Sequence, residues 1–348
     1  TERGRALGMM GSVVASGLTA GPVLGGLLIH YFSWRAIFYI NIPIGLLTAT
    51  GVFFLLKGSK ADITRQETFD WSGAVILAVL LGSLLMAITH AYDWGYFSTP
   101  TLLLLALCIL AAACLLYAET RVRHPILSRS LFEIRLFSMP IMAAVILFVC
   151  LFSLVFLMPF YLIHPRGYPV NTVGGIMACI FVALFVVSPF SGALFDRIGS
   201  RFLCTLAMAL IACSLFSLSS IPVKASFFSI IWRLSLAGIG TAIFLPPNSA
   251  AAFSAVTPEH RGVASAPVAA ARNLGMVLGV AIAGAIFNSV FYNLSNGLSL
   301  KEYQPALEGI SMDSFHFVMK AGGFIAILGM IISFLRGPEN VKVGRRQL

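Results

Sequence analysis

The sequence predicts a helical membrane protein, and three observations support that prediction. Hydrophobic residues make up 59% of the chain, charged residues make up 10%, and the mean hydropathy is +0.94. Apolar runs of roughly 20 residues, the length of a helix that crosses a bilayer, recur along the whole chain. Such runs are too long for the strands of a membrane barrel, which have about 10 residues. The predicted fold class is therefore all-α and membrane-spanning.

Ten runs are long enough to cross a bilayer. Their bounds are roughly 8–30, 36–56, 72–91, 100–118, 138–163, 172–194, 202–221, 226–250, 264–290 and 314–335. When successive connections are assigned to alternate sides, sixteen of the 23 Lys and Arg residues fall on one side and five on the other. Positive residues mark the cytoplasmic side of a membrane protein. The net charge of +10 thus indicates a membrane topology and not a nucleic-acid partner.

Within the first run, Gly17, Gly21 and Gly25 recur at every fourth position, with Pro22 and Gly26 beside them. On a helix this spacing forms a stripe without Cβ atoms, along which a second helix can approach to backbone contact. In a soluble helix each glycine would cost about 1 kcal/mol relative to alanine. The pattern therefore favours a packed interface inside a bilayer, where close packing is what such glycines provide.

The first run has a counterpart 258 residues later in the chain. Adding 258 aligns Arg3, Gly4, Ala6, Gly17, Gly21 and Gly26 with Arg261, Gly262, Ala264, Gly275, Gly279 and Gly284. Duplicated halves are typical of secondary transporters. Within its own half of the chain, the second copy is preceded by four runs (138–163, 172–194, 202–221 and 226–250), whereas no run precedes the first copy, so we expect four further helices before residue 1. The runs 72–91 and 100–118 have no counterpart and are predicted to be an inserted pair.

The predicted organisation has five parts. These are the last two helices of a first bundle (1–56), a basic linker with the inserted pair (57–118), a cytoplasmic connection (119–137), a six-helix second bundle (138–337) and a cytoplasmic tail (338–348).

Four motifs resemble the major facilitator superfamily, and within it the fourteen-helix drug/proton antiporters of the EmrB and QacA type. The glycine and proline stripe matches the antiporter motif of the family's fifth helix, and Trp34-Arg35 opens a segment similar to the start of its sixth. The segment 192–201 resembles its cytoplasmic loop motif, and Arg272-Asn273 begins a segment similar to its thirteenth helix. The resemblance covers essentially the whole chain. It implies a major facilitator helical bundle and an amino-terminally truncated fragment that holds helices five to fourteen.

The loop motif consists of Gly192, Asp196, Arg197, Gly199 and Arg201. The resemblance implies a charge latch that holds neighbouring helices together in one access state and releases them in the other. The same residues also fit a short turn whose arginines extend toward the headgroups. For the glycine stripe, the resemblance implies that the first helix packs against the opposite half and seals the outer side. Plain helix packing is the alternative.

Five residues are candidates for lining a substrate cavity: Arg272, Asn273, Asn41, Phe156 and Phe185. A guanidinium at the depth of Arg272 costs about 2.5–3.5 kcal/mol on insertion scales, which favours a water-filled cavity or a carboxylate partner. The alternative is that Arg272 extends to the inner headgroups. The two phenylalanines belong to a set that would either wall a cavity for flat apolar substrates or face lipid.

None of the acidic residues lies centrally in a run. A proton-coupled transporter generally needs a titratable group within the membrane, so the resemblance implies that this carboxylate belongs to helices before residue 1. No nucleotide loop, metal cluster or nucleophile arrangement is visible in the sequence. We therefore expect no enzymatic chemistry, no metal and no cofactor.

The predicted function is export of amphipathic drugs or toxic compounds across the cytoplasmic (inner) membrane, in exchange for protons and by alternating access. The expected partners are the lipid bilayer, the small amphipathic substrate and protons, and the resemblance also admits a periplasmic adaptor protein. A dedicated exporter of a single metabolite or siderophore would share every motif. A membrane-embedded enzyme and a non-transporting receptor are alternatives from other classes.

Overall fold

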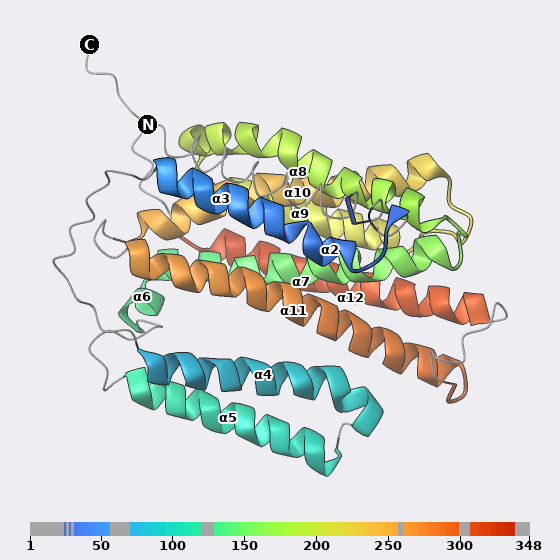
Figure 1. Cartoon of the computed structure of the whole chain (residues 1–348), viewed down its shortest axis with the longest axis horizontal. Helices are drawn as coiled ribbons and strands as arrows, with labels where there is room; N and C mark the ends of the chain where they lie inside the picture. Colours follow the sequence, from blue (N-terminus) through green and yellow to red (C-terminus); the bar gives the residue numbers. More distant parts are fainter. Residues whose placement is uncertain are drawn as a thin grey trace.

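The computed structural model describes residues 24–25, 28, 31–55, 70–95, 97–119, 129–256, 261–298 and 307–337, and its elements in that part are all helices (Figure 1). Nine of the helices described there are long and apolar enough to cross a membrane. This finding confirms the helical membrane fold. Most of the predicted run 8–30 lies outside the described residues.

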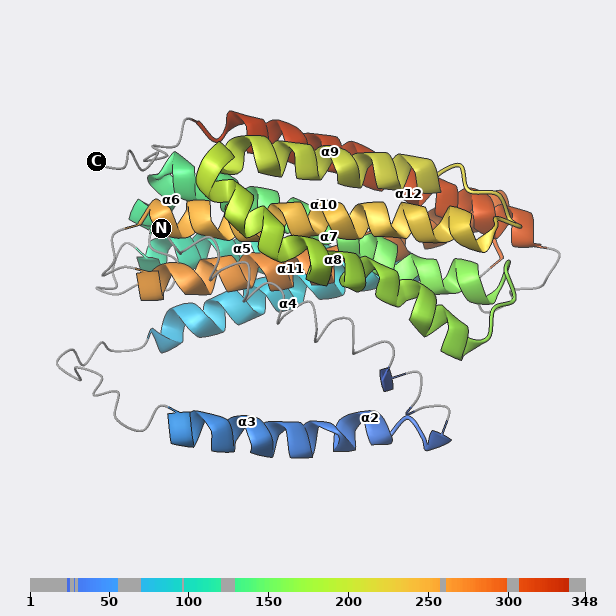
Figure 2. The same ribbon diagram turned by 90° about the horizontal axis from the view of Figure 1, so that it is seen from above.

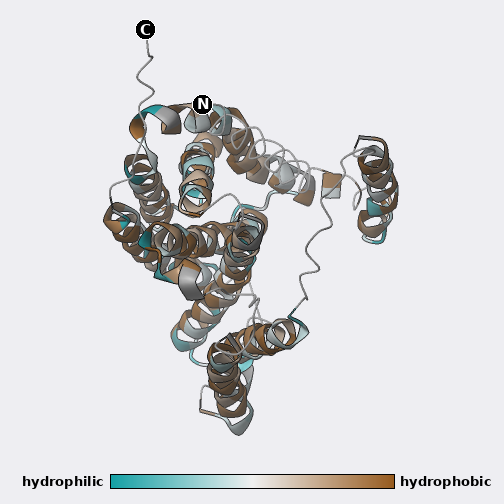
Figure 3. Ribbon diagram, turned by 90° about the vertical axis from the view of Figure 1, so that its left-hand side faces the viewer, coloured by the Kyte–Doolittle hydropathy of each residue, from teal (hydrophilic) through white to brown (hydrophobic). Residues whose placement is uncertain are grey.

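The first described helices are α2 (Ala36–Tyr39) and α3 (Asn41–Leu55), which follow each other almost in line. Figures 2 and 3 show them apart from the other helices. Among the described residues, the substantial contacts of α3 are with α2, and apolar side chains such as Leu47 and Phe54 are about 70% exposed. A helix that is apolar all round needs an apolar surrounding, which lipid or further helices supply.

The inserted pair forms a helical hairpin of α4 (Trp71–Trp94) and α5 (Thr99–Glu119). Asp70 caps α4, because its carboxylate accepts hydrogen bonds from the Gly73 backbone N–H at 2.8 Å and from the Ser72 hydroxyl at 2.6 Å. The turn between the helices contains Gly95 with φ of +95°, a conformation that favours glycine. The hairpin lies beside the six-helix bundle and contacts it through α4, which packs on α11 (Figure 1).

Six long helices form the main bundle. They are α7 (Arg135–Ile163), α8 (Val170–Ile198), α9 (Ser200–Leu218), α10 (Phe227–Ser254), α11 (Arg261–Leu294) and α12 (Glu308–Leu335), preceded by the short α6 (Arg129–Glu133). α7 is the most buried of them, because it contacts α11, α12, α10 and α8. Most of the helices extend a few residues beyond the apolar runs. The run 202–221 is the clearest exception, because its helix already ends at Leu218.

Most residues of the described helices are hydrophobic (Figure 3), and many of their large apolar side chains are exposed. Phe190, Phe228 and Phe324, for example, are each more than 60% exposed. An apolar exterior of this extent fits a protein whose surface meets lipid tails.

Candidate functional site

The second copy of the glycine stripe brings α11 into backbone contact with α7. A Cβ atom built at Gly275 would lie 2.6 Å from the carbonyl oxygen of Val145, and one built at Gly279 would lie 2.6 Å from that of Val149. Both distances are shorter than any real carbon–oxygen contact, so no other residue fits there without moving a helix. The Ser153 hydroxyl adds a polar contact, 2.9 Å from the Gly279 carbonyl oxygen. We call this contact line the α7–α11 seam.

The first copy of the stripe is described at one position. A Cβ atom built at Gly25 would meet no atom of the described residues within 4 Å. Gly17, Gly21, Pro22 and Gly26 lie outside the described residues. A role for the first copy in joining two halves therefore stays a prediction.

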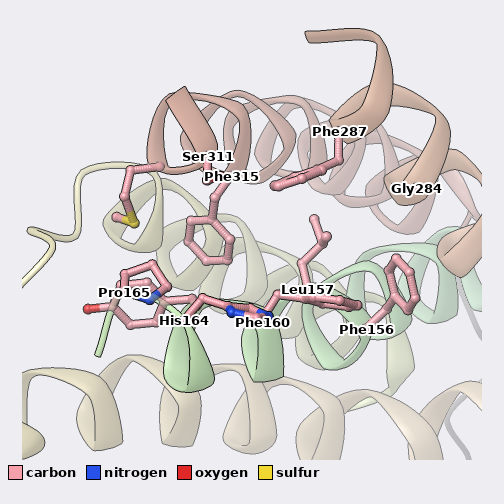
Figure 4. Close-up of a pocket in the computed structure, with 11 residues that line it drawn as sticks. Phe156, Leu157, Phe160, His164, Pro165, Gly284, Phe287, Ser311 and Phe315 are labelled. Carbon is pink, nitrogen blue, oxygen red and sulfur yellow. The ribbon is translucent and has the colours of Figure 1, made fainter. Parts of the chain in front are cut away.

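Beyond the seam, toward the end of the bundle opposite the basic connections, α7 and α11 diverge. A Cβ atom at Gly284 would be 3.7 Å from the nearest atom of the Phe156 ring, which is an ordinary contact. A cavity of about 230 Å³ opens here between α7, α11 and the start of α12 (Figure 4). Its lining residues are Phe156, Leu157, Phe160, Tyr161, His164, Pro165, Gly284, Phe287, Ser311, Met312 and Phe315. We call it the aromatic pocket.

Rings from three helices form the walls of the aromatic pocket. Phe156 and Phe160 meet edge to face, with centroids 5.5 Å apart. Tyr161 of α7 and Phe315 of α12 stack at 5.5 Å with an interplanar angle of 24°. Figure 4 shows the Phe287 ring directed into the same space from α11. Both arrangements are favourable ones for aromatic pairs.

Two carbonyl groups of the α9–α10 connection contact side chains of α7 and α12, and we call these two contacts the outer brace. The Tyr161 hydroxyl donates a hydrogen bond to the Pro222 carbonyl at 3.0 Å, and Nε2 of His316 lies 2.8 Å from the Ile221 carbonyl oxygen. The connection is thereby attached to α7 and α12 at once. This attachment positions the stacked pair Tyr161–Phe315 and so one wall of the pocket.

The polar groups in the pocket are few. His164 lies at the end of α7, and Ser311 lies in the first turn of α12. The Ser311 hydroxyl oxygen is buried, and no described residue offers it a hydrogen bond. A buried hydroxyl without a partner costs free energy, so this oxygen is the natural position for a hydrogen bond to a bound molecule.

At the opposite, basic end of the bundle, Arg336 is fully buried at the end of α12. Its Nη1 donates to the Ser200 hydroxyl at 2.6 Å, and its Nη2 donates to Oδ1 of Asn248 at 3.0 Å. The Asn248 amide in turn donates to the Pro140 carbonyl at 3.0 Å. We call this set the Arg336 network. It connects α7, α9, α10 and α12 to one another at the basic end of the bundle.

The predicted loop motif lies beside the Arg336 network. Gly199 has φ of +84° and allows the tight turn from α8 to α9. Arg201 stacks its guanidinium 4.2 Å from the centroid of the Phe334 ring on α12, whereas Arg197 is exposed. Gly192 is buried within α8, and the side chain of Asp196 lies outside the described residues. Arg201 thus contacts α12, and the charge latch itself stays a prediction.

Arg336 is one of the cationic residues on the predicted cytoplasmic side, and the sequence does not predict its burial. It stands one residue beyond the last apolar run, where a solvated arginine is common, so its position gave no sign of burial.

The predicted cavity residues do not come together. Of the five, Phe156 lines the aromatic pocket, whereas Phe185 is 48% exposed on α8. Asn41 is exposed at the start of α3 and donates to the Ile37 carbonyl of the preceding α2 at 3.2 Å. Arg272 is half-buried on α11 with Asn273 exposed next to it, and no described residue forms a hydrogen bond or ion pair with Arg272. A cavity formed by all five stays a prediction.

Trp34 and Arg35, predicted at the outer start of the second run, lie next to each other at the entry to α2. The Arg35 guanidinium is 4.7 Å from the centroid of the Trp34 ring, and Trp34 is 58% exposed. An amphipathic pair of this kind is typical of the membrane–water interface.

Three curated relatives illustrate the similarity to known proteins. The chain is 29% identical over 285 residues to the multidrug resistance protein Stp of Mycobacterium tuberculosis, covering 82% of this chain and 52% of Stp. It is 27% identical over 294 residues to the riboflavin transporter RibZ of Clostridioides difficile, covering 84% of this chain and 63% of RibZ. It is 24% identical over 347 residues to the multidrug transporter protein MdtP of Bacillus subtilis, covering 98% of this chain and 62% of MdtP.

The chain thus spans between about half and two thirds of the length of these relatives. The family model of the major facilitator superfamily matches residues 1–70 and 71–280, which is most of the chain. With the helical bundle and its apolar exterior, this match establishes the family: the chain belongs to the major facilitator superfamily.

Proposed function

We propose that the protein exports amphipathic compounds across the cytoplasmic membrane in exchange for protons. The observation that supports this proposal most directly is the family match together with relatives such as Stp and MdtP, whose names describe multidrug resistance and transport. We further propose the fourteen-helix type. The α4–α5 hairpin beside the six-helix bundle supports it, because a pair of helices between two six-helix halves brings the total to fourteen.

The packing of the six-helix bundle fits alternating access. The α7–α11 seam connects two helices of the bundle along their length, and the Arg336 network connects four helices at the basic end. These contacts allow the bundle to move as a rigid unit. Alternating access in transporters of repeated architecture is largely rigid-body rocking of one bundle against another. The first glycine stripe would supply a close contact between the two halves.

A transporter of a single metabolite is the second candidate function. The relative RibZ is named as a riboflavin transporter, and the chain is 27% identical to it. The two functions differ in substrate breadth and not in architecture, so only transport measurements separate them.

The test is transport by the full-length natural protein in proteoliposomes with an imposed pH gradient. We expect ethidium and several unrelated aromatic drugs to move against their gradients, each with a counterflow of protons reported by an entrapped pH dye. Movement of one compound only would favour the single-metabolite transporter. Movement that continues unchanged without any pH gradient would contradict proton exchange. Co-purification from the native membrane would show whether a periplasmic adaptor protein binds.

A further inference from the structure

The described residues that line the aromatic pocket all come from a single bundle. Its walls come from α7, α11 and α12, which all belong to the six-helix bundle. A transport cavity shared by two duplicated halves would lie between the bundles. The pocket is therefore a separate feature that the proposed export does not require.

The shape of the pocket follows from the α7–α11 seam. The two helices touch at Gly275 and Gly279, and they have separated to ordinary contact distance at Gly284. Larger side chains follow on both helices, and Phe160 and Phe287 lie on opposite sides of the resulting space (Figure 4). The space is thus built into the packing of the bundle and is held open by the outer brace at Tyr161 and His316.

The lining selects for flat apolar molecules. Five of the eleven lining residues are Phe or Tyr, and they present both ring faces and ring edges. Aromatic rings prefer offset-stacked and edge-to-face neighbours, so a flat ring gains more here than a flexible alkyl chain of equal area.

Size and polarity narrow the ligand further. An apolar cavity of about 150 Å³ holds benzene, so the 230 Å³ of this pocket has room for a compound of one or two rings. The buried Ser311 hydroxyl, without a partner among the described residues, can accept or donate one hydrogen bond. Pockets that bind small molecules typically combine an apolar wall with a few such polar groups.

We infer that the aromatic pocket is a binding site for one- or two-ring aromatic compounds that carry a single hydroxyl or amine, with that group hydrogen-bonded to Ser311. The rings insert between Phe160 of α7, Phe287 of α11 and Phe315 of α12. The site binds such compounds whether or not they are exported.

The test is equilibrium binding of 1-naphthol to the full-length natural protein in lipid nanodiscs, followed by the fluorescence of the naphthol. Gly284→Leu fills the pocket from α11, and we expect it to abolish saturable binding. The matched control is Gly309→Leu at the nearby start of α12, where a Cβ atom meets no described atom within 4 Å. We expect this control to bind like the wild type.

Ser311→Ala tests the hydrogen bond. Loss of one such bond should weaken 1-naphthol binding about three- to tenfold and leave naphthalene, which has no hydroxyl, unchanged. Equal binding of 1-naphthol by the wild type, Gly284→Leu and Ser311→Ala would overturn the assignment. Displacement of naphthol by equimolar 1-decanol would also overturn it, since the pocket would then hold lipid-like chains.

Two further measurements keep the result interpretable. Thermal unfolding of each variant shows whether it folds, and if Gly284→Leu does not, Ser311→Leu fills the same pocket from α12. Export of ethidium is measured on the same proteins. Naphthol binding without ethidium export would support the binding site and contradict the proposed function. Ethidium export without naphthol binding would contradict the binding site alone.

Discussion

The burial of the Arg336 side chain depends on its hydrogen-bond partners. A buried guanidinium loses its hydration, and only well-placed hydrogen bonds compensate for that loss. Ser200 and Asn248 supply two such bonds, while Nε of Arg336 has no partner among the described residues. Removing a partner should therefore be more harmful than removing the charge itself.

We predict that Asn248→Leu lowers the free energy of unfolding by about 3 kcal/mol, because it leaves a buried charge with a single partner. Arg336→Met should be milder, and the double variant should recover part of the loss caused by Asn248→Leu alone. The measurement is the apparent melting temperature of the purified protein in detergent. The control is Arg197→Met, which changes an exposed arginine and should shift stability by less than about 0.5 kcal/mol. A double variant no more stable than Asn248→Leu would contradict this account.

Tyr161 gives a second residue-scale prediction. Tyr161→Phe keeps the ring that stacks on Phe315 but removes the hydrogen bond to the Pro222 carbonyl. We expect a loss of about 0.5–1.5 kcal/mol in unfolding free energy and faster hydrogen exchange in the 219–226 connection. Unchanged exchange there would show that the hydroxyl does not hold the connection. Phe160→Leu, which leaves that bond in place, serves as the control for a change in the same helix.

At the scale of elements, glycine spacing decides which helices approach most closely. Only glycine fits at Gly275 and Gly279, because the α7 carbonyls occupy the space of a Cβ atom. The inserted hairpin shows a different principle. α4 packs against both α5 and α11. Among the described residues, α4 is the one helix that α5 packs against to a large extent. The placement of α5 in the membrane therefore depends mainly on its lipid-facing apolar surface.

The α7–α11 seam can be tested by a matched pair of alanine substitutions. We predict that Gly279→Ala destabilises the protein by about 1–3 kcal/mol, since its Cβ must push the two helices apart. Gly284→Ala should be neutral or stabilising by up to about 1 kcal/mol, because its Cβ makes an ordinary contact and alanine favours the helix. Both are read as shifts in apparent melting temperature. Equal shifts for the two variants would argue against a strained contact at Gly279.

At the scale of the whole molecule, the six-helix bundle packs around its own core, while α2 and α3 stand apart from it (Figure 2). In the proposed transporter, a second bundle would occupy the space beside the six-helix bundle, and the first glycine stripe would form the close contact between helices of the two halves. The equivalent stripe on α11 shows that this glycine spacing allows backbone contact between helices, although its partner α7 belongs to the same bundle.

We predict that Gly21→Leu in the full-length natural protein makes proteoliposomes leak protons, because a large side chain would separate the helices that seal the outer side. Proton influx is followed with an entrapped pH dye after an external acid pulse. The control is Gly51→Leu in α3, where a Cβ atom meets nothing within 4 Å in the part of the chain that the structure describes. Proteoliposomes of Gly21→Leu as tight as those of the control would contradict a sealing role for the stripe.

The sequence by itself determined the fold class, the positions of the membrane-spanning helices and the spacing of the glycines at Gly275 and Gly279. These features are local, because hydropathy and helical period act over about 20 residues. Only the tertiary structure decided that Phe156 lines a pocket while Phe185 does not, and that Arg336 is buried. Phe156 and Phe185 both lie in strongly apolar helices, and the partners of Arg336 stand up to 136 residues away. Which face of a helix turns inward, and which distant groups meet there, depends on packing between helices that no local pattern records.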